Sequence, residues 1–99
     1  MMDGESIKRL LWYLLLGTRG GVNRARIINA LKGRPMNTNQ LAEALKVDYS
    51  TMEHHLKILK EHGLVVTEGQ KYAVIYFLSR AIENGYNVFL EIWEKIRTK

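Results

Sequence analysis

The chain has 99 residues, contains no cysteine and carries a formal net charge of +5. This length predicts one domain, 1–99, with a modest core, and the lack of cysteine excludes disulfide bonds, thiolate metal sites and cysteine catalysis. The whole charge excess lies within residues 19–80, which hold ten basic and five acidic residues. A basic centre between neutral ends indicates that the middle of the chain binds a polyanion.

The first predicted element is a helix over about residues 5–16, because apolar side chains recur there at helical spacing. Its run LLWYLLL is much shorter than the roughly 20 residues of a membrane span. We therefore expect a cytoplasmic protein that makes no membrane contact. Residues 1–18 are apolar on most sides, which predicts that a second surface covers this helix.

A second helix is predicted over about residues 21–32, ended by Gly33 and Pro35. Ile27, Ile28 and Leu31 recur on the side expected to face the core. Arg24 and Arg26 fall on the other, more exposed part of the helix. This placement predicts that both arginines contact DNA phosphates.

Residues 38–62 predict a helix-turn-helix motif. The first helix starts at Asn37 or Thr38, the turn is Lys46-Val47-Asp48, and Asp48 caps a helix over about 49–62. On a helical wheel, Met52, Leu56 and Leu59 form an apolar stripe opposite a polar face. That is the pattern of a helix that reads the DNA major groove. The residues that we expect to contact DNA are Thr38, Asn39, Gln40, Tyr49, Ser50, Thr51, Glu53, His54, Lys57, Lys60, Lys71, Arg24 and Arg26.

A β-hairpin is predicted over residues 64–77, with strands at Leu64–Thr67 and Lys71–Phe77 and the reversal at Glu68-Gly69-Gln70. Three helices and a hairpin make a mainly helical (α+β) winged helix-turn-helix fold. A last helix within 79–99 is capped by Ser79 and breaks or begins near Asn84-Gly85. The two terminal helices are expected to dimerise through Ile7, Leu11, Leu14, Leu15, Tyr86, Phe89, Trp93 and Ile96.

Residues 24–65 closely resemble the ArsR-type winged-helix transcriptional regulators, especially their small archaeal members. The resemblance rests on ARIINAL, LAEAL and STMEHHLKILKEHGLV. It implies a homodimer that binds double-stranded operator DNA, usually as a repressor. Metal-sensing members carry cysteines in the first helix of the motif, whereas NQLAEALKV has none. The short wing, TEGQK, does not favour deep insertion into the minor groove, and Lys71 and Tyr72 are its best candidates for backbone contact.

Other kinds of chemistry are poorly supported by the sequence. His54, His55 and His62 do not converge with carboxylates at metal-ligand spacing, so neither a metal site nor a cofactor is expected. No nucleophile, phosphate loop or carboxylate pair suggests an enzyme. A small-molecule effector stays unknown. Two alternatives to a specific regulator remain open: a nucleoid-type protein that coats DNA without sequence preference, and a winged helix that binds another protein.

Overall fold

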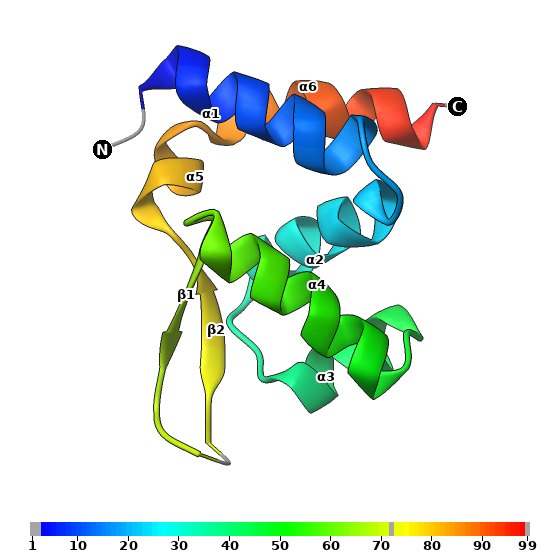
Figure 1. Ribbon diagram of the computed structural model, residues 1–99, viewed down its shortest axis with the longest axis vertical. Helices are drawn as coiled ribbons and strands as arrows, with labels where there is room; N and C mark the ends of the chain where they lie inside the picture. Colours follow the sequence, from blue (N-terminus) through cyan, green and yellow to red (C-terminus); the bar gives the residue numbers. More distant parts are fainter. Residues whose placement is uncertain (1–2, 72, 99) are drawn as a thin grey trace.

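The computed structural model describes residues 3–71 and 73–98 and has the expected fold: a mainly helical chain with one two-stranded antiparallel hairpin (Figure 1). In these residues no helix is both long enough and apolar enough to cross a membrane. In chain order the elements are α1 (Gly4–Leu11), the π-helix η1 (Trp12–Leu16), α2 (Gly21–Gly33), α3 (Thr38–Leu45), α4 (Tyr49–Glu61), β1 (Val65–Glu68), β2 (Ile75–Leu78), α5 (Arg80–Asn84) and α6 (Tyr86–Arg97).

The helix-turn-helix forms where the sequence predicts it, because both of its helices carry good N-caps. Asn37 accepts from the backbone N–H of Gln40, and the Gln40 side chain accepts from the backbone N–H of Asn37. Asp48 caps α4 by accepting from the backbone N–H of Thr51 at 2.9 Å. Between them Lys46 takes a left-handed conformation, with φ of 57°, and turns the chain.

The wing departs from prediction in its second strand, which begins at Ile75 rather than Lys71. Lys71 is left-handed, with φ of 55°, and the backbone N–H of Ala73 donates to the Gln70 carbonyl. Neither feature is compatible with a strand. Strand β1 ends at Glu68 and β2 begins at Ile75, so the two strands are farther apart in sequence than the three-residue reversal we expected. Strand β2 also pairs with Met36 through two backbone hydrogen bonds of Tyr76, which ties the wing to the segment before α3.

Helix α6 packs against α1 and η1. The terminal helices therefore form a layer at the end of the molecule opposite α3 and the wing tip (Figure 1). The last helical segment breaks at Gly85, as predicted. This layer corrects part of the expected dimer interface, because α6 already covers the apolar side of the first helix. Five of the eight assigned residues are at most 2% exposed and belong to the core of one subunit: Ile7, Leu11, Leu14, Leu15 and Phe89.

Candidate nucleic-acid interface

Helix α4 presents one polar face to solvent and buries the opposite one. Met52, Leu56 and Leu59 are fully buried and hold the helix to the core. The side chains expected to face DNA, Ser50, Glu53, His54, Lys57 and Lys60, line its outer side. The orientation of α4 therefore follows the wheel, and the contacts of its exposed face with DNA remain a prediction.

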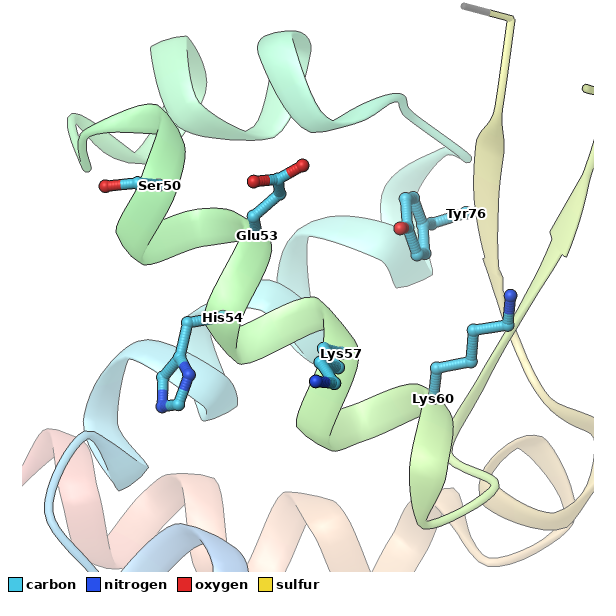
Figure 2. A pocket seen from close by; sticks show the side chains of 6 residues that line it. All are labelled: Ser50, Glu53, His54, Lys57, Lys60 and Tyr76. Carbon is cyan, nitrogen blue, oxygen red and sulfur yellow. The ribbon is translucent and has the colours of Figure 1, made fainter. Parts of the chain in front are cut away.

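The exposed face of α4 and the wing enclose a groove of about 490 Å³. Figure 2 shows Tyr76 on β2 pointing toward α4, while Lys60 extends from the helix toward the strand. Tyr76 was not among the residues singled out in the sequence. Its position is set by pairing with Thr67 on β1 and with Met36, contacts that link distant parts of the chain. The groove thus combines basic side chains with an aromatic hydroxyl, a set suited to phosphate and base edges.

A second hollow of about 270 Å³ lies where α3, α4 and the wing loop meet. It gathers four residues that the sequence assigned to DNA, Thr38, Asn39, Tyr49 and Lys71, although they come from three separate elements. Tyr72, the other proposed wing contact, lies outside the described residues. The two concavities together therefore hold most of the predicted contact residues.

The first turn of α4 is already occupied by its own cap. Besides the backbone N–H of Thr51, the Asp48 carboxylate accepts the hydroxyls of Ser50 at 3.0 Å and Thr51 at 2.8 Å. These hydrogen bonds, first of all those from Thr51, lower the pKa of Asp48, so the cap is ionised at neutral pH. The DNA contacts predicted for Ser50 and Thr51 therefore have to compete with a carboxylate that holds both hydroxyls.

The prediction that Arg24 lies on the exposed part of α2 is wrong, because its side chain is only 3% exposed. Its guanidinium donates to the Leu14 carbonyl from Nε at 3.2 Å and from Nη2 at 3.0 Å. It also donates to the Arg19 carbonyl, the Thr18 hydroxyl and Nδ1 of His55. Arg24 thus closes the carbonyl end of η1 and joins that end to α4.

Arg26 is also engaged within the subunit. It donates to the Leu45 carbonyl at 2.7 Å, at the end of α3, and to the Asn23 side chain at 3.0 Å. Both arginines that the sequence assigned to phosphate therefore hold helices together. Within residues 19–34, Arg19, Lys32 and Arg34 are exposed cations.

His55 lies on the buried side of α4, contacts Arg24 and is 5% exposed. Burial lowers the pKa of His55, and the nearby charge of Arg24 and the neighbouring His54 lower it further. The neutral ring accepts from Arg24 Nη1 at Nδ1. A protonated ring could not accept this hydrogen bond.

We expect the folded protein to lose stability as pH falls below the ordinary histidine pKa of about 6.5. The unfolded chain takes up the His55 proton first, since the folded-state pKa of His55 is lower. The loss therefore extends from about pH 6.5 down to that lower pKa, and the contribution is complete above pH 6.5. His55→Asn keeps an acceptor near Nδ1 but removes the titration, so its melting temperature should change less between about pH 8 and 5. His62→Asn is the matched control, and parallel curves for all three proteins would contradict the assignment.

Comparisons with known proteins agree with this geometry. The profile described as bacterial regulatory protein, arsR family, matches residues 21–67. The HTH-type transcriptional regulator NmtR of Mycobacterium tuberculosis is 32% identical over 56 residues. That match covers 57% of this chain and 47% of the relative, so it spans about half the length of the curated protein.

Solved structures extend the similarity to the whole fold. Reduced HlyU from Vibrio cholerae superposes with a TM-score of 0.66 at 24% identity, covering 87% of this chain and 86% of that one. Rv0081 of M. tuberculosis gives a TM-score of 0.68 at 18% identity, over 99% and 96% of the two chains. The ST1889 protein of the archaeon Sulfolobus tokodaii gives 0.57 at 26% identity, over 98% and 97%. Residues 21–67 are thus similar to the arsR-family helix-turn-helix, and the chain as a whole shares the fold of these solved structures.

Proposed function

We propose that this protein is a dimeric, sequence-specific DNA-binding regulator of transcription that acts as a repressor. The observation that carries the proposal is the free polar face of α4, beside a groove that Lys57, Lys60 and Tyr76 help to line. An arsR-type helix-turn-helix and a curated relative named as a transcriptional regulator support it. Helix α4 enters the major groove in this proposal, and the wing lies along the backbone beside it.

The deciding experiment is selection of genomic DNA fragments by the purified protein, followed by footprinting. We expect protected pseudo-palindromic sites whose half-sites lie about 34–36 Å apart on one face of the duplex. Excess random DNA should leave these complexes largely intact. Equal competition by random DNA at all salt concentrations would instead indicate a nucleoid-type protein, whose affinity depends on phosphate neutralisation alone. No binding even at low salt would reject both forms of DNA binding.

The dimer surface that we propose is the outer side of the terminal helices. Trp12 on η1 and Leu90 on α6 are large apolar residues with 42% and 48% of their surface exposed. Tyr86, Trp93 and Ile96, which the sequence assigned to the interface, are half-buried. Trp12 lies on η1 and the other four residues lie on α6, in the layer of terminal helices, where a second copy of the chain could pack.

Leu90→Gln should shift the protein from dimer toward monomer, because it places a polar amide within the proposed apolar surface. Val66→Gln is the matched control, since Val66 is 46% exposed, close to the 48% of Leu90, but lies on β1 in the wing. Sedimentation equilibrium measures the effect. We expect at least a roughly tenfold weaker association for Leu90→Gln, which corresponds to about 1.4 kcal/mol. Equal association constants for the two variants would place the interface elsewhere.

A further inference from the structure

A cavity of about 380 Å³ lies between η1 and α4, separate from the groove that faces the wing. Its apolar lining includes Tyr13, Leu14 and Ile58. Its polar lining comes from Thr18, Arg19, Arg24, His54 and His62. The volume falls within the range of about 300–1,000 Å³ typical of small-ligand sites. Segments that precede the helix-turn-helix and the reading helix itself thus share one concave surface.

Apart from the phenol of Tyr13, the ionisable side chains that line this cavity are all basic. Two arginines and two histidines line it, and no carboxylate does so among the described residues. Arg24 is nearly buried, and each acceptor it contacts is an uncharged carbonyl, hydroxyl or imidazole. A buried cation whose neighbours are all neutral favours the approach of an anion.

The apolar residues of the lining indicate which class of anion the cavity fits. Tyr13, Leu14 and Ile58 offer a surface for carbon atoms, which an inorganic ion or a DNA phosphate would leave uncovered. A phosphate of the DNA backbone also contacts protruding cations more readily than a guanidinium that is only 3% exposed. The lining therefore fits a small molecule with a carboxylate at one end and an apolar body.

We infer that this cavity binds a small organic carboxylate and that its occupancy weakens DNA binding. The link is His54, which lines both this cavity and the groove beside the wing. In Figure 2 His54 extends on the side of α4 opposite to Glu53, toward the layer of terminal helices. A carboxylate that engages His54 withdraws it from the DNA-facing groove and brings a negative charge close to the backbone of bound DNA. By reciprocity, DNA lowers the affinity for the carboxylate by the same factor.

Binding is tested first on the free protein, so that this arm does not depend on the proposed function. Backbone amide shifts are followed in NMR titrations with benzoate, phenylacetate and hexanoate, with benzamide and inorganic phosphate as controls. We expect at least one carboxylate to saturate with a dissociation constant of about 1 mM or below, and the largest shifts around Tyr13, Arg19 and His62. Benzamide and phosphate should shift these amides far less.

Variants assign the site. Arg19→Gln and His62→Gln should each weaken carboxylate binding by roughly tenfold, whereas Arg80→Gln, which removes an exposed cation outside the cavity, should leave it unchanged. Three outcomes would overturn the inference: saturation by none of the three carboxylates, equal binding of benzamide, or equal weakening by Arg80→Gln. Saturation of the same amides by inorganic phosphate or by a random duplex would reassign the cavity to the DNA backbone.

The second arm rests on the proposed function and measures affinity for a selected duplex by fluorescence anisotropy. A saturating carboxylate should weaken DNA binding by roughly 5- to 150-fold in the native chain and much less in Arg19→Gln. Unchanged affinity while the carboxylate is bound would overturn the coupling. Failure of the protein to bind any DNA would reject the proposed function, and the titration of the free protein would still decide whether the cavity binds carboxylates.

Discussion

Arg24→Met should lower the free energy of unfolding by about 3 kcal/mol or more. Methionine keeps much of the volume of the arginine side chain but donates no hydrogen bond. The carbonyls of Leu14 and Arg19 and Nδ1 of His55 would each lose a donor in a largely buried region. Chemical denaturation measures the loss, which corresponds to a fall in melting temperature of roughly 12–24 °C for a domain of this size.

The matched control for Arg24 is Arg34→Met, which removes an exposed cation and should change stability by less than about 0.5 kcal/mol. Failure of the Arg24→Met variant to fold would also agree with a structural role. The opposite result is a variant that melts with the native chain but binds every DNA sequence less tightly. That result would indicate that Arg24 contacts DNA phosphates, and it would contradict the structural role that we assign to this buried side chain.

Lys57→Gln should weaken binding to a selected DNA site by roughly 5- to 100-fold, equivalent to about 1–3 kcal/mol. Lys57 lies at the middle of the exposed face of α4, where a helix in the major groove comes closest to base edges. The loss should be larger for the selected site than for random DNA, because a base contact is sequence-dependent and a phosphate contact is not. Fluorescence anisotropy at several salt concentrations measures both affinities.

Lys8→Gln serves as the control for Lys57, since it removes an exposed cation from α1 in the layer of terminal helices. It should change neither affinity by more than about twofold. Equal losses at the selected and random duplexes would assign Lys57 to the backbone. If Lys57→Gln binds both duplexes like the native chain, α4 does not read the major groove through this residue.

The helix-turn-helix could be predicted from the sequence because its signals are local. Asn37 and Asp48 are caps within a few residues of the groups they bind, and Met52, Leu56 and Leu59 mark the buried side of α4 by their spacing. Each of these patterns is decided within one or two turns of helix. The break at Gly85 is another local signal, and the structure has it where the sequence indicated.

The environment of Arg24 could not be predicted, because its partners come from other elements. Helical spacing says which side of α2 the residue occupies but not that the carbonyl end of a π-helix lies opposite. The same limit applies to Tyr76, whose place in the groove depends on pairing with Thr67 and Met36. Nor does an apolar stripe on a terminal helix reveal whether another helix of the same chain or a second copy covers it. For Leu11 and Phe89 the answer is the same chain.

The cap of α4 has a consequence for the proposed binding of this helix to DNA. Asp48 fixes the side chains of Ser50 and Thr51 before any DNA is present. The rotamer freedom of these residues is therefore lost when the chain folds, and association has less disorder to remove. A preorganised first turn favours binding without conformational change. The shape of α4 is then already complementary to the duplex in the free protein, and few of its side chains have to change rotamer on binding.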